Sequence, residues 1–261
     1  MKNIKLLLAG LICAGSVVSL TACGKKKNKV VIGYTYFAPI AFKEEGSKEL
    51  TGFDVELARK VFAQIDKTNG TTTTIEFQEI NWDSKETLLD NGTIDLVWNG
   101  LTITNSRKEN MEISIPYLNN QQVAVIKKTD SAKYTDLESL KDTVCTVESG
   151  SAGEDAINGY TKELINCESQ LDALNRLKEG TSDVAVIDSV MAVYYTTTSN
   201  FKDSLMIVKD LVLATEQYGI AAKKGNTKLI NDINAALKAI KDTEFKTLAE
   251  QYGLTDYIAV A

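Results

Sequence analysis

The spacing of apolar residues changes repeatedly along the chain, between a pattern typical of strands and one typical of helices. Residues 55–65 (VELARKVFAQI) carry apolar side chains three and four positions apart, which predicts a helix. Residues 30–33 (VVIG) and 94–98 (IDLVW) are short apolar runs, which predict strands. The further strands that the pattern predicts are 71–77, 123–126, 143–147, 163–166, 183–187 and 218–222, and the further helices are 84–89, one opened by 150–153, 171–177, 189–195 and helices within 229–252.

The alternation of these strands and helices is typical of parallel β-α-β units. The pattern restarts near residues 123–126, so the chain of 261 residues holds two similar α/β blocks, which suggests two lobes. No low-complexity linker separates the blocks, and the joint is therefore expected to consist of strands that cross directly. The pattern leaves open which lobe the last strand and the final helices join.

The first 22 residues have a different character. A short start with Lys2 and Lys5 precedes an uncharged apolar run over residues 6–20, an order typical of a secretory signal. The run is short for a membrane span, although a single transmembrane anchor is the alternative. The quartet that ends in Cys23 (LTAC) resembles a bacterial lipobox, which implies cleavage before Cys23 and lipid attachment to its sulfur. Residues 23–29 would then form a lipid-anchored tether with lysines beside anionic headgroups.

Charge and composition exclude several classes of function. Without Lys2 and Lys5, the 29 basic residues fall to 27 against 35 acidic ones, which leaves a net charge of −8. A nucleic-acid-binding protein would need a basic face, so we expect no nucleic-acid partner. The absence of histidine removes Ser-His-Asp and Cys-His catalysis and the usual zinc ligand sets. We therefore expect neither a metal site nor a cofactor.

Cysteine use leaves one question open. Cys13 lies in the predicted signal and Cys23 is the lipidation candidate, so Cys145 and Cys167 remain. Outside the cytoplasm these two residues could form a disulfide. Two buried thiols are the alternative, and the sequence does not decide between them.

Arginine is used sparingly, and one arginine follows a distinctive stretch. Arg107 comes after Leu101-Thr102-Ile103-Thr104 and is the only arginine between Arg59 and Arg176. Its planar fork of donors matches a carboxylate or a phosphate better than a lysine does. Arg107 is therefore a candidate for binding an anionic group, and a solvated charge at a helix start is the alternative.

Five segments of the chain follow one another in a distinctive order. They are 52–62 (GFDVELARKVF), 94–128 (IDLVWNGLTITNSRKENMEISIPYLNNQQVAVIKK), 147–157 (VESGSAGEDAI), 183–192 (DVAVIDSVMA) and 218–226 (YGIAAKKGN). Together they resemble the extracytoplasmic amino-acid-binding proteins of ABC importers, solute-binding protein family 3, which includes glutamine- and histidine-binding proteins. The resemblance implies an α/β, periplasmic-binding-protein-like fold with two lobes, each a mostly parallel sheet flanked by helices, joined by two crossing hinge strands. The implied boundaries are 30–117 and 217–258 for lobe 1 and 122–212 for lobe 2.

The resemblance also implies a site for a zwitterion. Arg107 would bind the α-carboxylate and Asp188, on the other lobe, the ammonium, so that bound ligand favours the closed state. Asp188 and Ser151 also fit ordinary helix caps, and Asp54 is expected only as the cap of helix 55–65. The residues that would add donors and acceptors are Gly100 through its carbonyl, Thr102, and Ser151 with the amide of Ala152 at a helix start.

Specificity is less clearly encoded. The loop Tyr34-Thr35-Tyr36-Phe37 and Trp82 lie where the family places aromatic or side-chain-reading residues, and they are expected as walls around the ligand. A core position is the alternative for Tyr36, and Trp98 is expected in the core. Glutamine-binding relatives have an aspartate and a lysine at the positions of Tyr34 and Glu148, a departure that puts glutamine in doubt. Glu148 would favour a cationic or amide-donor side chain, or it would point to solvent.

The leading functional hypothesis is capture of a free L-amino acid for import. The implied partners are an ABC permease and its ATPase subunits, and the protein is expected as a monomer anchored by lipid on the extracytoplasmic face of the bacterial cell membrane. One alternative is a dehydratase acting on a cyclic carboxylate, with Glu148 as its only acid candidate. Another is an extracytoplasmic sensor module. Retention of Arg107 and Asp188 suits an intact amino acid, so we expect a binding protein and no enzyme.

Overall fold

The computed structural model describes residues 26–198 and 200–260. The predicted signal peptide and Cys23 lie outside these residues. The tether prediction for residues 23–29 is wrong from Lys26 onward, because Lys26–Tyr34 forms strand β1 and its backbone pairs with strand β4, starting at the pair Lys26 and Thr71. In the described part of the chain, no helix is both long enough and apolar enough to cross a membrane.

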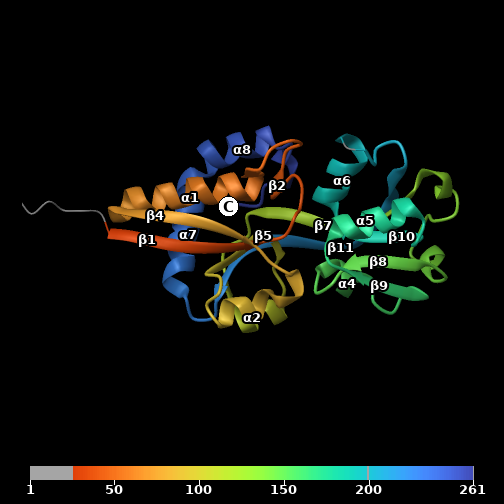
Figure 1. The fold of residues 1–261 in the computed structure, drawn as a ribbon, viewed down its shortest axis with the longest axis horizontal. Coiled ribbons are helices and arrows are strands. Elements are labelled where there is room, and N and C mark those ends of the chain that lie inside the picture. Colours follow the sequence, from red (N-terminus) through yellow and green to blue (C-terminus); the bar gives the residue numbers. More distant parts are fainter. Residues whose placement is uncertain (1–25, 199, 261) are drawn as a thin grey trace, which may run out of the picture.

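One large sheet runs through the whole molecule (Figure 1). Its strands follow the order β4-β1-β5-β11-β7-β10-β8-β9, with β6 paired to β11, and β2 and β3 form a separate small sheet. The strands are β1 Lys26–Tyr34, β2 Phe42–Lys43, β3 Leu50–Thr51, β4 Thr71–Glu79, β5 Leu96–Thr102, β6 Met111–Ile113, β7 Leu118–Lys127, β8 Val144–Glu148, β9 Glu163–Cys167, β10 Val184–Asp188 and β11 Leu205–Lys223. The α-helices are α1 Phe53–Asn69, α2 Lys85–Asp90, α3 Asn105–Asn110, α4 Ala152–Ile157, α5 Gln170–Glu179, α6 Ser189–Thr198, α7 Thr227–Ile240 and α8 Lys246–Gln251.

The sheet has two parallel parts joined by two long strands. Strands β4, β1 and β5 are parallel in one half, and β10, β8 and β9 are parallel in the other. Between them β7 and β11 pair antiparallel with each other and run from one half into the other (Figure 1). The lobe boundaries predicted at 117, 122, 212 and 217 lie within or beside these two strands and stay a prediction.

Helices cover both faces of the sheet in the first half, and this explains the apolar runs in its strands. Every residue of β5 is buried, with α1 and α2 on opposite sides of the strand (Figure 1). Trp98 faces the cluster that includes α1, as expected of a core aromatic, and is only 1% exposed. Leu101 faces the other way, into a cluster with Leu89 of α2. Two-sided burial of this kind is typical of parallel sheets.

Asp54 does not cap helix α1, contrary to the prediction. The helix begins at Phe53, so Asp54 lies in its first turn with its side chain directed into the protein. Its Oδ2 accepts hydrogen bonds from the amide of Gly100 at 2.9 Å and from the hydroxyl of Tyr117 at 2.7 Å. Burial raises the pKa of Asp54 to about 7. Asp54 therefore holds the backbone of β5 at Gly100, near the carboxyl end of the strand.

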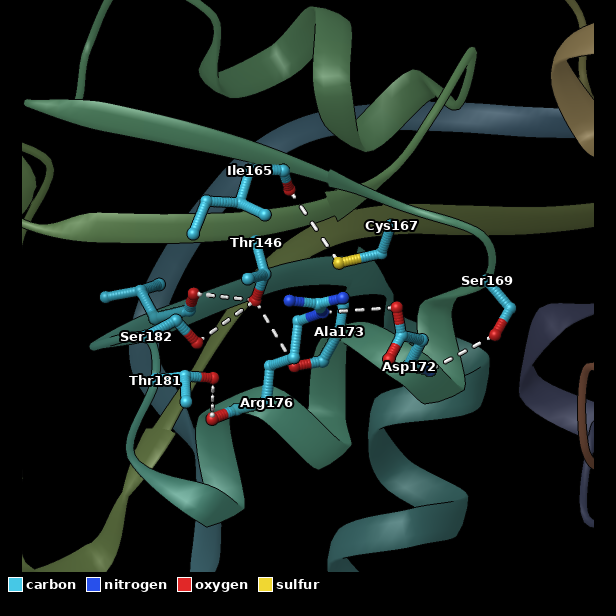
Figure 2. Close-up of polar contacts among 10 residues, drawn as sticks. Thr146, Ile165, Cys167, Ser169, Asp172, Ala173, Arg176, Thr181 and Ser182 are labelled. Atoms are coloured by element: carbon cyan, nitrogen blue, oxygen red, sulfur yellow. Dashed lines mark hydrogen bonds and ion pairs between the residues drawn. The ribbon is translucent and has the colours of Figure 1, made fainter.

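Cys145 and Cys167 are free thiols on opposite faces of the second sheet half, so the disulfide alternative is wrong. Cys167 of β9 pairs with Glu148 of β8, three residues from Cys145, a separation of about 10 Å along the strand. Alternation then directs the two sulfurs to opposite faces, whereas a disulfide needs Cα atoms within about 7 Å. Figure 2 shows Cys167 on the face of α5, its thiol donating to the carbonyl of Ile165 at 3.8 Å.

This arrangement predicts the thiol content of the protein. Produced from residue 24 onward and unfolded without reductant, the chain should accept two alkylating groups by mass spectrometry. The folded protein should react slowly, because burial raises the pKa of Cys145 to about 12 and that of Cys167 to about 11, which suppresses the reactive thiolate. A non-reduced unfolded chain that accepts no reagent would contradict the structure.

Candidate functional site

A cavity of about 270 Å³ lies between the two halves of the molecule. Its walls come from the carboxyl ends of β1 and β5 in one half and of β8 and β10 in the other, where polar side chains of parallel strands converge. A larger hollow of about 890 Å³ lies between α1 and α8, but it is open to solvent and no set of buried charges converges on it. The residues predicted for the site that line the cavity are Phe37, Trp82, Gly100, Thr102, Arg107, Glu148, Ser151, Ala152 and Asp188.

Arg107 is buried in the cavity wall, so it is not a solvated charge. It lies on α3, whose first turn is capped by the Thr104 hydroxyl, and its side chain is 7% exposed. Nη1 donates to the carbonyl of Thr102 at 2.9 Å, and Nη2 donates across the two halves to the carbonyl of Gly150 at 3.1 Å. Burial lowers the pKa of Arg107, and Glu216 offsets this. The guanidinium stays charged and is held in one orientation.

Asp188, at the end of β10, is embedded in side-chain donors and does not cap α6. Its Oδ1 accepts from the Tyr218 hydroxyl at 2.7 Å, from Nε2 of Gln122 at 2.9 Å and from Asn120, and its Oδ2 accepts from Gln170. The amide of residue 190, in the first turn of α6, instead donates to Oδ1 of Asn120 at 3.3 Å. The cap alternative for Asp188 is therefore wrong.

A second carboxylate, Glu216 of β11, shares the donors of Asp188. Nδ2 of Asn120 and Nε2 of Gln122 each bridge the two carboxylates, reaching Oε1 of Glu216 at 2.6 and 2.9 Å. Thr102 donates to the same oxygen at 3.1 Å. Burial and the nearby Glu216 charge raise the pKa of Asp188 well above its usual value. Two buried carboxylates this close disfavour full ionisation unless a cation joins them.

Gly100 allows β5 to bend at the cavity. Its φ is +65°, and the pairing of β5 with β11 shifts register between Gly219 and Ala221, opposite this point. A Cβ at Gly100 would lie 2.7 Å from Cε1 of Phe37, so both the backbone conformation and the space require glycine. The bend brings Gly100 and Thr102 to the cavity wall.

Ser151 is the N-cap of α4, as the alternative interpretation held. Its Oγ accepts from the amide of Glu154 at 3.1 Å, and Oε2 of Glu154 accepts from the amide of Gly150 at 2.7 Å. These bonds fix the turn that places Ala152 and Ser151 on the cavity. Capping does not prevent the Ser151 hydroxyl from donating its own hydrogen to a ligand.

Tyr34 does not line the cavity, and Thr35 takes its place. Tyr34 is the last residue of β1 and packs edge-on against Phe77, 6.4 Å between ring centres, in a small cluster with Val55. Because successive strand residues face opposite sides, the neighbouring Thr35 points to the cavity, where its Oγ1 accepts from Nδ2 of Asn99 at 3.1 Å. The predicted wall residues Phe37 and Trp82 are both on the cavity.

Glu148 points into the cavity and not to solvent. It ends β8, is 3% exposed, and its Oε1 has no hydrogen-bond partner among the described residues. Burial raises its pKa to about 8, partly offset by Gln170 and by the charge of Lys85. Lys85 is itself 4% exposed and donates to the carbonyls of Trp82 at 3.1 Å and Gly150 at 3.0 Å, and burial lowers its pKa to about 8.

Several residues in or beside the cavity escaped the sequence interpretation. Strict alternation from the predicted Thr102 would place Asn99 on the opposite face of the strand, and the bend at Gly100 brings it to the cavity. Gln170 and Lys85 are the first residues of α5 and α2 and gave no sign of burial, and Glu216 lies in a stretch that was not predicted as a strand. In the described ranges, no group of three or more cysteine and carboxylate side chains is placed to hold a metal ion.

The model of bacterial extracellular solute-binding proteins, family 3, matches residues 30–255. The chain belongs to this family. The matched residues include both halves of the sheet, both hinge strands and every residue that lines the cavity.

This family 3 protein is 28% identical over 261 residues to the ABC transporter glutamine-binding protein GlnH of Bacillus subtilis (strain 168), covering 91% of this chain and 92% of the relative. It resembles the structure of an ancestral arginine-binding protein bound to arginine, with a TM-score of 0.75, 31% identity, and coverage of 86% and 98%. It also resembles an ABC uptake transporter substrate binding protein from Streptococcus pneumoniae with bound histidine, with a TM-score of 0.74, 30% identity, and coverage of 86% and 92%. These likenesses confirm the predicted periplasmic-binding-protein-like α/β fold.

The state of Glu148 predicts how stability depends on pH. The unfolded chain loses this proton near pH 4.5 and the native protein near pH 8, so the native state binds more protons between these values and stability falls as pH rises. Glu148→Gln removes this loss, about 1.4 kcal/mol per pH unit. Urea unfolding without added ligand should show a gain over the parent protein that is near zero at pH 4.5 and grows towards pH 8.

Glu163→Gln is the matched control, because Glu163 is exposed on the neighbouring strand β9. Its unfolding free energy should follow that of the parent protein at every pH. The other buried carboxylates are common to all three proteins and cancel in the differences. A gain for Glu148→Gln that stays constant across the pH range would refute the buried, protonated state.

Proposed function

We propose that the protein binds a free amino acid in the cavity between its lobes, outside the cytoplasmic membrane, and delivers it to an ABC permease with its ATPase subunits. The observation that carries the proposal is the placement of a buried guanidinium, Arg107, and a buried carboxylate, Asp188, on walls of one cavity that belong to different lobes. An α-amino acid offers one anion and one cation to match. The relatives named for glutamine, arginine and histidine support this class of ligand.

The donors of Arg107 suit an α-carboxylate. A guanidinium carries five N–H donors, and two of those of Arg107 bond the carbonyls of Thr102 and Gly150. Three remain for an anion in the cavity. The hydrogen bond from Arg107 to the Thr102 carbonyl, within the same lobe, fixes the orientation of the guanidinium. The ligand's carboxylate would therefore meet N–H donors that are already oriented.

The ammonium of the ligand has its counterpart in the carboxylate pair. Asp188 and Glu216 are held together by shared amide donors, which leaves their mutual repulsion only partly compensated. A cation beside Asp188 favours ionisation of the pair and is therefore attracted to it. Since Arg107 and Asp188 belong to different lobes, a ligand that contacts both stabilises the closed arrangement.

Glu148 has the raised pKa that the dehydratase alternative would require, yet the three relatives are all named as binding proteins, and no observation favours turnover over binding.

The lipid anchor at Cys23 belongs to the same proposal. With β1 beginning at Lys26, only two residues separate Cys23 from the folded chain, so the anchored protein would stand close to the membrane surface. Import of a captured amino acid requires the binding protein to reach the permease, and attachment keeps its local concentration high.

A binding screen tests the function. At least one of the twenty L-amino acids should raise the melting temperature in proportion to the logarithm of its concentration over Kd. Arg107→Ala should weaken binding of that amino acid by at least roughly 100-fold by calorimetry, because two charge-assisted bonds contribute about 1.5–3 kcal/mol each. Lys108→Ala, an exposed neighbour on α3, is the control and should bind like the parent protein. Full-strength binding by Arg107→Ala would remove this residue from the site.

Cys23→Ser tests the anchor. The exported parent protein should partition with the membrane fraction, whereas the variant should appear in the medium or the periplasmic extract, since its attachment point is gone. A Cys13→Ser variant controls for loss of a thiol in the same region. Membrane partition of the exported Cys23→Ser protein would place the anchor elsewhere.

A further inference from the structure

Five buried side-chain polar atoms lack a hydrogen-bond partner in the described part of the protein, and two of them belong to cavity residues. These two are Oε1 of Glu148 and Oδ1 of Asn99, one from each lobe. The other three belong to Asp54, Trp98 and Gln122, which do not line the cavity. Buried acceptors without donors are rare in native proteins because such a group loses its hydrogen bonds to water and gains none in return.

Neighbouring donors do not satisfy these two acceptors. Lys85 directs its ammonium to the carbonyls of Trp82 and Gly150. The amide hydrogen of Asn99 goes to Thr35, and the Gln170 amide donates to Asp188. The groups that would bind the α-carboxylate and the ammonium, Arg107 and Asp188, are separate residues with their own partners. Glu148 and Asn99 are therefore left over for the rest of the ligand.

From this geometry we infer that the cavity selects an amino acid whose side chain ends in N–H donors, which Glu148 and Asn99 accept. The inference rests on the proposed function and adds its ligand class. A side-chain carboxamide, guanidinium, ammonium or imidazole supplies such donors. A ligand with a side-chain carboxylate would place its own acceptor oxygens, and a negative charge, against the oxygens of Glu148 and Asn99. A ligand with an aliphatic or thioether side chain would leave both of these protein oxygens without a hydrogen bond.

The electrostatic surroundings of Glu148 agree with this selection. Lys85 and Arg107 are the cations whose charges act on it. Burial raises the pKa of Glu148, hydrogen bonds from Gln170 and Thr35 offset this only in part, and Oε1 keeps no partner. A donor from the ligand supplies the missing stabilisation. The buried carboxylate of Glu148 thus lowers the stability of the ligand-free protein and raises its affinity for the ligand. Functional residues often lower stability in this way.

The experiment is calorimetric titration of the full exported protein with three near-isosteric ligands, glutamine, glutamate and methionine, together with arginine, lysine and histidine. At least one N–H-donating side chain should bind 100-fold or more tightly than both glutamate and methionine, since a site built around a substrate N–H strongly rejects analogues that lack it. Tightest binding of glutamate, methionine or another aliphatic amino acid overturns the inference. Failure of every amino acid to bind overturns the proposed function instead.

Two variants then test Glu148 directly and separate the two kinds of donor. Glu148→Leu should weaken the preferred ligand at least tenfold while the melting temperature of the protein without ligand rises, an outcome that a merely structural role would not produce. Glu148→Gln keeps an acceptor but loses the charge, so it should retain most of the affinity for a neutral amide and lose it for a cationic side chain. Glu163→Gln should match the parent protein. Unchanged affinity in Glu148→Leu would remove Glu148 from ligand recognition.

Discussion

Burial of charge between the two lobes is the constraint on which the rest of the structure depends. Arg107, Asp188, Glu148 and Lys85 are each at most 7% exposed, and removing an ion from water costs several kcal/mol unless partners replace the solvent. The chain supplies most of those partners itself. Examples are the buried side-chain amides of Asn120 and Gln122 on the hinge strand β7, which donate to Asp188. Among these four charged residues, Glu148 keeps one buried oxygen without a partner, and Glu148 lines the cavity. In the proposed function, the ligand supplies the missing hydrogen bond.

The polar site is carried by an apolar framework that is largely legible in the sequence. A short apolar run locates β5, which is buried on both faces, and apolar residues at helical spacing locate α1. The first part of β11, over residues 205–217, was missed, because a strand that spans the hinge has exposed stretches and no simple alternation. The lipobox-like segment lies outside what the structure describes, and its role still rests on residue order alone.

Within the site, the sequence was most informative about which residue types take part and least informative about which way their side chains face. Arg107 was singled out because its guanidinium matches an anionic group, and Asp188 was assigned through the resemblance to the family. Tyr34 was misplaced by a single residue, and in a strand one residue reverses the facing of every side chain. Lys85 resembles an ordinary helix-surface lysine, but it is buried against Trp82 of its own lobe and Gly150 of the other lobe. Contacts made across lobes have no signature in a local pattern.

Asp188 is bonded to both hinge strands, through Asn120 and Gln122 on β7 and through Tyr218 on β11. The residue proposed to bind the ligand's ammonium is thus also hydrogen-bonded to both strands that connect the lobes. A substitution at Asp188 that changed ligand specificity would therefore also remove hydrogen bonds to the hinge strands and so change how readily the lobes close.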